Sequence, residues 1–276
     1  MPELPEVETT RRGLIVALEG RRITRAEVGH PRMLRRQDNP ADFAARLEGR
    51  RVLSLGRVGK FLMFDVEGHF TWVTHLGMSG RISLNHPDDH RVTHTHVVVS
   101  TDAGAEVRMV DPRTFGFTVV YTPEELADST LARLGPDALN SLPRTPGMVA
   151  AAHGRSVAIK TLLLDQRFIA GLGNIYADEV LFDARIEGTR PASLITRNEM
   201  KAIRGAIGPV LRAGLKFGGT SLNDLAYLLP DGRAGEYVKR LNVYGREEEP
   251  CRRCGAEIQR QVIGGRSSFS CPRCQH

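Results

Sequence analysis

Between Pro5 and Gly20, apolar residues recur every three to four positions, which predicts an amphipathic helix at the start of the chain. Proline suits the first turn of such a helix, and glycine suits the position after its end. The apolar positions of this predicted helix are Val7, Leu14, Ile15 and Leu18.

After this helix the pattern changes to short runs rich in Val, Leu, Phe and Thr, which are separated by Gly, Asp or Pro turns. Such runs predict β-strands, and close spacing without long helices between them indicates an antiparallel sandwich or barrel. A short helix is predicted over residues 40–47. The predicted strands cover residues 22–28, 51–56, 61–66, 70–76, 96–101, 106–110 and 117–121.

Beyond Thr122 the pattern becomes helical, with predicted helices over residues 124–127, 129–134, 157–164, 175–183 and 197–217. Residues 165–173 make two turns between two of these helices. Residues 223–235 are polar and irregular, and they form either a lid or a plain surface connection. We therefore predict three parts: residues 1–122, a β-sandwich; residues 123–235, a helical part; and residues 236–276, a tail.

Composition limits the possible partners. No apolar run approaches the ~20 residues that a membrane helix requires, and the N-terminus lacks the cationic and apolar segments of a signal peptide. We therefore expect an intracellular protein with no membrane partner. The chain carries 38 Lys and Arg against 32 Asp and Glu, a net charge of +6. This excess permits nucleic-acid binding but does not establish it.

All four cysteines, Cys251, Cys254, Cys271 and Cys274, fall in the last 26 residues. Two Cys-x-x-Cys pairs separated by sixteen residues can supply four thiolates to one tetrahedral Zn²⁺. Two disulfides are the alternative. A four-thiolate site leaves no open coordination position, so this zinc would be structural. Arg266 lies near the tip of the predicted hairpin, where it suits either a phosphate contact or a solvated cationic face.

Pro2 and Glu3 place a potential nucleophile beside a carboxylate. Pro2 is small, so Met1 should be trimmed, leaving a secondary amine that can attack an electrophilic carbon and form an iminium. The positive end of the helix dipole disfavours the protonated amine, so the pKa of the amine should be lowered. Pro-Glu sequences are also common at the starts of helices, so these residues alone do not decide whether the terminus is catalytic.

Other features have both a functional and a structural interpretation. Lys60 shares a strand face with Leu62 and Phe64, which suits a nearby anion or an edge lysine that reaches solvent. The loops 75–80 and 111–116 present bulky side chains, which suit either wedges in a base stack or plain core packing. His94 and His96 alternate on a predicted strand and should not share a metal. The glycine-rich turn before Ile175 offers backbone amides to a phosphate.

Taken together, these features resemble formamidopyrimidine-DNA glycosylases, in that family's order and over nearly the whole chain. The resemblance implies an α+β fold with two lobes: an N-terminal antiparallel β-sandwich with flanking helices, and a C-terminal helix–two-turns–helix bundle plus a four-cysteine zinc finger. It rests on the opening Pro2-Glu3-Leu4-Pro5-Glu6-Val7-Glu8-Thr9, the loops 75–80 and 111–116, residues 171–178, Asn242-Val243-Tyr244-Gly245-Arg246 and the four-cysteine tail.

The resemblance implies a DNA repair enzyme that excises oxidised purines, such as 8-oxoguanine and formamidopyrimidines, and then cleaves the abasic strand. Pro2 would attack C1′ of the flipped nucleotide while Glu3 moves protons around the sugar. The resulting iminium acidifies the C2′ proton, so β- and δ-elimination follow. One structural Zn²⁺ is the implied cofactor. Duplex DNA with oxidised bases is the implied partner of a monomer in the bacterial cytosol, associated with the nucleoid.

The same resemblance implies roles for further residues. Lys60 matches the proton donor of β-elimination, and Arg266 matches its counterpart in δ-elimination. These matches favour the functional interpretation of Lys60 and of the two loops. The implied DNA-binding residues are His75, His94, Arg113, Arg155 and the phosphate ligand Asn174, with Met78, Arg113 and Phe115 filling the gap left by the extruded base.

Two departures from the family pattern weaken the expected phosphate contacts. Thr114 stands where many relatives carry a basic residue, and Gly154-Arg155-Ser156 is less basic than the Lys-rich run often seen there. Two other functions stay possible. An endonuclease VIII-type enzyme for oxidised pyrimidines usually opens Pro-Glu-Gly-Pro-Glu, whereas this chain has Leu4. A non-enzymatic zinc-ribbon DNA-binding protein would need neither a free Pro2 nor Glu3.

Overall fold

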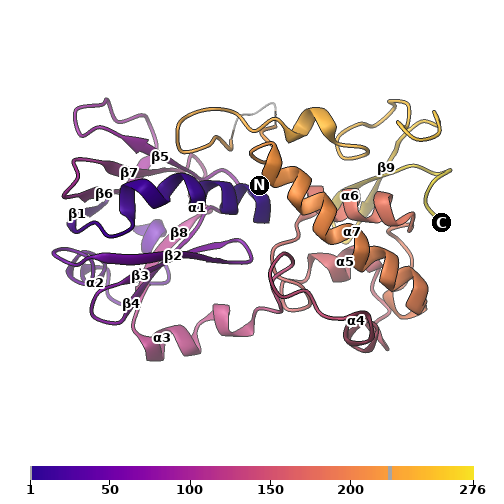
Figure 1. Cartoon of the computed structure of the whole chain (residues 1–276), viewed down its shortest axis with the longest axis horizontal. Helices are drawn as coiled ribbons and strands as arrows, with labels where there is room; N and C mark the ends of the chain where they lie inside the picture. Colours follow the sequence, from indigo (N-terminus) through magenta and orange to yellow (C-terminus); the bar gives the residue numbers. More distant parts are fainter. Residues whose placement is uncertain (1, 223–225) are drawn as a thin grey trace. The chain divides into compact units, whose positions relative to one another are not determined.

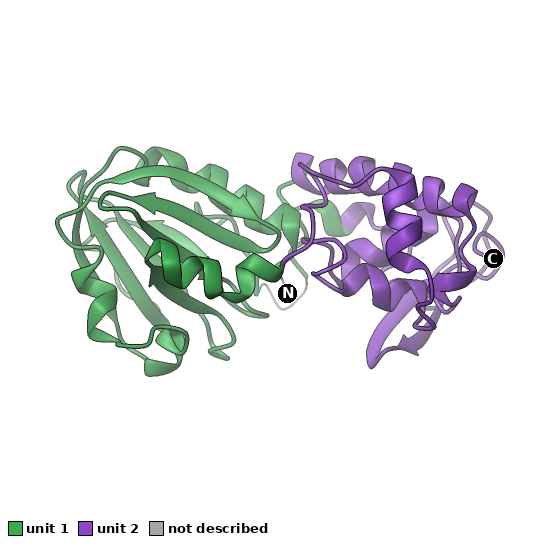
Figure 2. Ribbon diagram, turned by 90° about the horizontal axis from the view of Figure 1, so that it is seen from below, with its two compact units in different colours: residues 1–133, 217–238 green, residues 134–216, 239–276 purple. Residues whose placement is uncertain are grey.

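The computed structural model describes residues 2–222 and 226–276 (Figure 1). The chain forms two compact units (Figure 2). The first contains the chain up to Arg133 together with Phe217–Val238, and the second contains Leu134–Lys216 and Lys239–His276. Among the described helices, none combines the length and the apolar character needed to cross a membrane. The three-part division of the sequence remains a prediction.

Two antiparallel four-stranded sheets build the first unit, in the orders β1-β6-β7-β5 and β2-β3-β4-β8. The sequence analysis predicted all of these strands except β5, although Ile82 and Leu84 alternate there with polar residues, as is typical of a half-buried strand. The strands are β1 (Ile23–Val28), β2 (Val52–Val58), β3 (Phe61–Val66), β4 (Phe70–His75), β5 (Arg81–Asn85), β6 (Thr95–Thr101), β7 (Glu106–Val110) and β8 (Phe117–Tyr121).

The two sheets share one hydrophobic core, which makes the unit a β-sandwich. In β3, strand alternation sends Leu62 and Phe64 inward, and in β6 it does the same for Val97 and Val99. Phe64 stacks on Trp72 of the neighbouring strand, with ring centroids 4.3 Å apart. Each such side chain contributes about 1.5–3 kcal/mol by leaving water.

Helix α1 (Leu4–Leu18) covers this core with Val7, Leu14 and Leu18, all fully buried. It therefore begins and ends close to the predicted positions. The predicted helix over residues 129–134 is only a short 3₁₀ turn, η2. The remaining short elements of the first unit are η1 (Pro31–Leu34), α2 (Ala41–Ala45), α3 (Pro123–Asp128) and η2 (Thr130–Arg133).

The second unit is a helical bundle. Its longest helices pack closely, because the Tyr176 ring of α6 lies against Gly214 of α7, where a Cβ would meet the phenol oxygen at 2.5 Å. Helix α4 was not predicted, since Pro146 and Gly147 disguise its first turn. The elements are α4 (Thr145–Ala152), α5 (Ile159–Leu164), α6 (Asn174–Ala184), η3 (Ala192–Leu194) and α7 (Arg197–Lys216).

The tail follows η4 (Tyr237–Arg240) and ends in a hairpin of β9 (Gln259–Ile263) and β10 (Arg266–Ser270). Gly264 and Gly265 form the two-residue turn, with φ of 56° and 76°. Positive φ at both positions is typical of a tight hairpin turn, which glycine adopts without steric cost. The hairpin joins α6 through a small core that contains Phe182, Ile258 and Phe269.

Candidate functional site

The N-terminal dipeptide is held at the start of α1 in the first unit. Pro2 and Glu3 are both buried. The backbone N–H of Glu3 donates to Glu6 Oε2 at 2.8 Å, and the N–H of Thr220 donates to Glu6 Oε1 at 2.7 Å. One buried carboxylate therefore joins the catalytic candidate Glu3 to the segment that follows α7. Met1, whose removal the proposed chemistry requires, lies outside the described residues.

The loop predicted over residues 223–235 belongs to the same unit. Its first three residues lie outside the described part of the chain. Pro230 accepts a hydrogen bond from Leu84 N at 3.0 Å and packs closely on Gly13 of α1. Tyr227 donates its hydroxyl to Glu6 O at 3.3 Å. The described part of this loop is therefore packed against α1 and β5.

Lys60 lies in the turn between β2 and β3 and is only 7% exposed. Because β3 is an inner strand, Lys60 is not the solvent-reaching edge lysine that the sequence left open. Arg57 ties this turn to α1, since its Nε donates to Glu8 Oε2 at 3.2 Å and its guanidinium also donates to Gly59 O at 2.8 Å. Leu62 is buried on β3, whereas Lys60 lies one residue before that strand.

The carboxylate of Glu8 is strongly stabilised in its charged form. Burial acts to raise its pKa, but hydrogen bonds from Arg11 and Arg12 and the positive charges of Arg11 and Arg57 outweigh burial and lower the pKa to about 2. The resulting ion pairs connect α1 to the β2–β3 turn at neutral pH. They thereby fix the backbone beside Lys60.

The two loops with bulky tips are organised by Asp111, which is fully buried. Its carboxylate accepts hydrogen bonds from Ser79 Oγ at 2.5 Å, in the first loop, and from Gly116 N at 2.7 Å, in the second. Gly77 packs so tightly on Phe115 that an added Cβ would lie 2.4 Å from the Phe115 carbonyl carbon. The two loops therefore form one rigid platform.

Large side chains project from this platform into solvent. Met78 and Phe115 are each 42% exposed, and the Arg113 guanidinium lies 5.1 Å from the centre of the Phe115 ring. Exposed apolar side chains on a rigid base suit insertion between bases better than core packing, which would bury them.

His75 ends β4 beside the platform, between the rings of Phe61 and Phe117. Burial, together with the positive charges of Lys60, Arg36 and Arg35, lowers its pKa to about 3. Its Nδ1 accepts the Gly77 N–H at 3.0 Å, so the proton of the neutral ring is on Nε2. His75 is therefore an uncharged hydrogen-bond donor at neutral pH.

The arrangement of His94 differs from the sequence prediction. His94 precedes β6 with a positive φ of 67°, and the register of β6 shifts between Thr95 and Val97. The His94 and His96 rings lie 6.0 Å apart. The expectation of opposite faces was wrong, because residues two positions apart on a strand point to the same face. Among the described residues, only the four cysteines are arranged to hold a metal ion.

In the second unit, a buried ion pair anchors the start of β10. Lys160 of α5 and Asp178 of α6 are 0% and 1% exposed, with 2.8 Å between Nζ and Oδ1. Lys160 also donates to Ser267 O at 2.9 Å, and Asp178 accepts from Ser268 Oγ and Phe269 N, both at 3.0 Å. Burial raises the pKa of Asp178 to about 6, although the charge of Lys160 opposes the shift.

These contacts hold the residues that follow Arg266, which is itself exposed. Asn174, at the start of α6, donates its side-chain amide to Ser267 O at 2.9 Å. Gly264 packs on Thr161 of α5. The tip of the hairpin is therefore seated on α5 and α6. Arg155 lies elsewhere in this unit, exposed.

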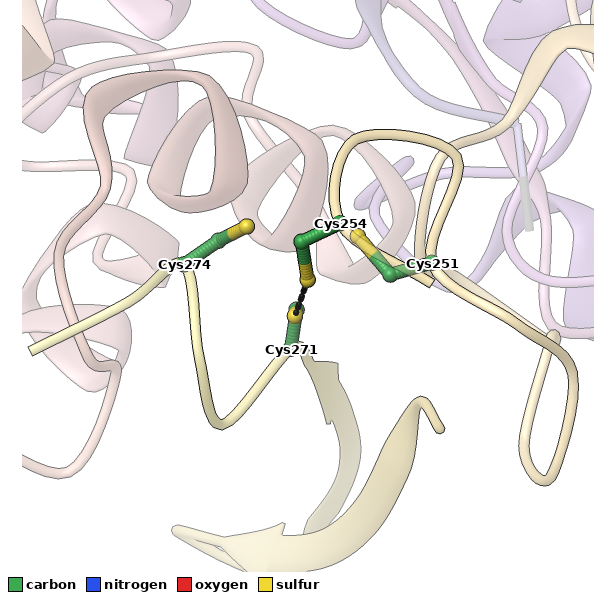
Figure 3. Close-up of side chains that lie close together, drawn as sticks. All are labelled: Cys251, Cys254, Cys271 and Cys274. Atoms are coloured by element: carbon green, nitrogen blue, oxygen red, sulfur yellow. Dashed lines mark hydrogen bonds between the residues drawn. The ribbon is translucent and has the colours of Figure 1, made fainter. Parts of the chain in front are cut away.

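The four cysteine thiols converge at the base of the hairpin (Figure 3). All four are free, and their sulfur atoms lie within 4.8 Å of one another. Cys254 and Cys271, one from each pair, are 3.5 Å apart. Such spacing fits a tetrahedral four-thiolate site, and these four cysteines form no disulfide. The tail therefore contains a structural zinc site.

Family models match three parts of the chain. Residues 1–118 match the formamidopyrimidine-DNA glycosylase N-terminal domain, residues 134–225 match the H2TH domain of the same enzymes, and residues 248–276 match the zinc finger found in FPG and IleRS. Together these matches cover most of the chain. The chain belongs to the formamidopyrimidine-DNA glycosylase family.

Relatives within this family are similar over their full length. The chain is 43% identical to the formamidopyrimidine-DNA glycosylases of Gluconobacter oxydans and Rhizorhabdus wittichii, with complete coverage of all chains. The crystal structure of MutM (Fpg) from Thermus thermophilus is similar with a TM-score of 0.89 at 39% identity, over 99% of this chain and 98% of that one. Lactococcus lactis Fpg in complex with abasic-site DNA is similar over both whole chains, with a TM-score of 0.91 at 31% identity. The predicted fold class is confirmed.

The site residues that the family resemblance implied fall into both units. The first unit holds Pro2, Glu3, Lys60, His75, Met78, His94, Arg113 and Phe115, and the second holds Arg155, Asn174, Arg266 and the cysteines. The sequence analysis missed Glu6, Asp111 and Asp178, which position these residues. A glutamate three residues after Glu3 is a helix-start signal that could have indicated Glu6. No local signal marks the other two.

Proposed function

We propose that this chain is a bifunctional DNA glycosylase and abasic-site lyase that excises oxidised purines from duplex DNA. Membership of the family supports this activity. The assignment of the catalytic residues is based mainly on Pro2 and Glu3, which are buried at the start of α1. The carboxylate of Glu6 fixes the backbone of Glu3. A terminal amine that acts as a nucleophile must be held close to its proton-transfer partner, and this arrangement provides that.

Pro2, once freed by removal of Met1, attacks C1′ of the flipped nucleotide. The glycosidic bond breaks as the new C–N bond forms, and the base leaves with a proton. Glu3 is the group that moves protons to and from the sugar ring, so that ring opening yields an iminium between Pro2 and C1′. The cationic iminium then acidifies the C2′ proton, which prepares the strand for elimination.

Lys60 and Arg266 act in the elimination steps. Lys60 supports β-elimination of the 3′ phosphate. It is nearly buried, and its turn is tied through Arg57 and Glu8 to α1, the helix that follows Pro2 and Glu3. Arg266, at the exposed hairpin tip, supports δ-elimination of the 5′ phosphate. Both residues carry cationic groups that suit phosphate leaving groups.

The remaining residues bind and deform DNA. His75, His94, Arg113, Arg155 and Asn174 contact the backbone, while Met78, Arg113 and Phe115 fill the space left by the extruded base. Lactococcus lactis Fpg has been crystallised with DNA that contains Fapy-dG and with DNA that contains an oxidised pyrimidine. We propose duplex DNA as the partner of a monomeric enzyme in the bacterial cytosol.

Borohydride trapping tests the covalent mechanism. The wild type should form a protein–DNA adduct on an 8-oxoguanine duplex, because borohydride reduces the iminium to a stable amine. Pro2→Gly, which keeps only a primary amine, should trap less adduct and excise more slowly. Glu3→Gln should bind the duplex with wild-type affinity but give no turnover. Peptide mass mapping should locate the adduct on Pro2.

The same assay separates the alternatives. A duplex with an oxidised pyrimidine and an undamaged duplex serve as controls. Adduct on the pyrimidine lesion alone would identify an endonuclease VIII-type specificity. Tight binding without any adduct would indicate a zinc-ribbon protein that lacks lyase activity. Wild-type excision by Glu3→Gln would remove Glu3 from the mechanism.

A further inference from the structure

Two adjoining cavities lie between α4 and α7 in the second unit. One has a volume of about 560 Å³ and is lined by the first residues of α4 and by Arg144, Arg197, Lys201 and Arg204. The other, also about 560 Å³, lies against Val149, Ala150 and His153. The two cavities share Pro146 and Arg197 in their walls, so they form one continuous groove, which we call the α4–α7 groove.

One half of the α4–α7 groove has a strong uncompensated positive charge. Four cationic side chains line it, and no carboxylate does. Among the described residues, none of these four cations makes an ion pair with an acidic side chain. Glu199, the one acidic residue of α7, is instead paired with Arg190 at 2.5 Å and accepts hydrogen bonds from Thr196.

The cationic half is partly pre-organised. Arg204 donates its Nε–H to Pro143 O at 2.7 Å, which fixes the guanidinium stem against the segment that leads into α4. The terminal N–H groups of Arg204 can therefore donate hydrogen bonds to an anion. A fixed guanidinium loses less side-chain entropy when it binds a carboxylate.

The other half of the groove is apolar. Val149 and Ala150 lie on α4, which has few polar side chains, and neither is buried. A phosphodiester backbone gains little from such a surface, because its recognition depends on cations and hydrogen-bond donors. An acidic segment followed by apolar side chains complements both halves of the groove.

Another cavity shows that this charge pattern is not a general property of the surface. A cavity of about 440 Å³ in the first unit is lined by Arg36 but also by Asp38, Glu125 and Asp128. Its three carboxylates outnumber its one cation, so it does not favour an anion. The cationic half of the α4–α7 groove has no carboxylate in its lining.

We propose that the α4–α7 groove docks an acidic peptide segment of a partner protein. The carboxylates of the segment bind Arg144, Arg197, Lys201 and Arg204, and a following leucine or phenylalanine side chain fills the cavity beside Val149. None of these groove residues is part of the proposed catalytic or DNA-binding set. A test can therefore contradict the docking site without contradicting the glycosylase mechanism, and the reverse is also true.

Fluorescence anisotropy with the full-length, zinc-loaded protein tests this proposal. The probe is a labelled short peptide in which a run of aspartates is followed by leucine and phenylalanine. The wild type should bind it, and Lys201→Glu/Arg204→Glu should weaken binding at least tenfold. Arg212→Glu/Lys216→Glu is the matched control, because it reverses two charges on α7 outside the groove and should leave peptide affinity unchanged.

Two further measurements complete the test. A peptide with asparagine in place of aspartate should lose affinity, and Val149→Asp should weaken binding of the original peptide while excision of 8-oxoguanine keeps its wild-type rate. Equal loss in the groove variant and the control variant, or unchanged affinity in Val149→Asp, would overturn the docking site. Binding of undamaged duplex DNA, but not of peptide, through Lys201 and Arg204 would assign the groove to DNA instead.

Discussion

Single buried carboxylates position the candidate catalytic and DNA-binding residues. Glu6 accepts hydrogen bonds from the backbone N–H groups of Glu3 and Thr220. Asp111 accepts hydrogen bonds from both loops of the platform, residues 75–80 and 111–116. A carboxylate offers several acceptor sites, so it can satisfy donors from segments far apart in the chain. A shorter or neutral side chain would leave some of these donors buried without a partner.

Asp111→Ala should therefore damage both loops together. It leaves the Ser79 hydroxyl and the Gly116 N–H without their acceptor, and each buried unsatisfied group costs about 1–3 kcal/mol. We expect a lower melting temperature and slower single-turnover excision of 8-oxoguanine. Asp88→Ala, which removes an exposed carboxylate from the same unit, is the control. Equal excision rates in the two variants would show that Asp111 does not position the platform.

Ion pairs between side chains of different helices, strands and turns hold these elements together. Glu8 of α1 binds Arg57 of β2, and this contact fixes the turn that leads into Lys60. In the second unit, Glu199 of α7 binds Arg190, and this hydrogen bond, more than burial, sets its pKa, which is lowered to about 2. Both carboxylates are therefore more acidic in the folded chain than their ordinary value of about 4.5.

These shifts predict a loss of stability in acid. A carboxylate with a lowered pKa stabilises the folded state fully above its unfolded pKa, near 4.5, and loses that contribution as the pH falls toward 2. We expect the free energy of unfolding to decline over this window. In Glu8→Gln the decline should be shallower, as measured by urea unfolding at several pH values. An identical pH profile for the variant would contradict the assignment to Glu8.

The Lys160–Asp178 pair links three elements, since it joins α5 and α6 to β10. Asp178→Ala removes the carboxylate of a buried ion pair, which typically costs about 3–5 kcal/mol. We expect this variant to lower the ratio of δ- to β-elimination products, because the pair holds Ser267, Ser268 and Phe269, the hairpin residues that directly follow Arg266. Replacing both residues, as Lys160→Met/Asp178→Leu, should recover stability but not the product ratio. If the double variant were as unstable as the single one, the pair would not be the cause.

Zinc acts on the whole second unit. Three of the cysteines, Cys251, Cys271 and Cys274, share a hydrophobic core with Phe182 of α6, so loss of the metal removes a support of the hairpin and of its contact with the bundle. Metal binding and folding are coupled in such small sites. We expect chelation, or Cys254→Ser, to weaken affinity for a lesion duplex and to abolish δ-elimination. Zinc content and DNA affinity, measured on the same preparation, check this; a zinc-free protein with full affinity would contradict it.

Several features were predictable from the sequence because local spacing encodes them. The strands of the sandwich follow from alternation, the zinc ligands follow from two Cys-x-x-Cys pairs, and the helix behind Pro2 and Glu3 follows from its apolar period. Strand β5 was missed although its residues alternate, because it is only five residues long, and helix α4 was missed because an early Pro-Gly pair disguises its first turn. The expectation for His94 and His96 failed because residues two positions apart on a strand share a face.

The sequence by itself therefore determined the family and the metal, and it led to the proposal of a reactive terminus, since each of these rests on motifs of residues that are close together in the chain. Only the tertiary structure revealed how Glu6 holds Thr220 from 214 positions away, how Asp111 unites two loops, and how Lys160 reaches Ser267. These contacts arise when packed sheets and helices bring distant segments within hydrogen-bond range. No local pattern of residues specifies such pairs, because burial, and not sequence spacing, selects them.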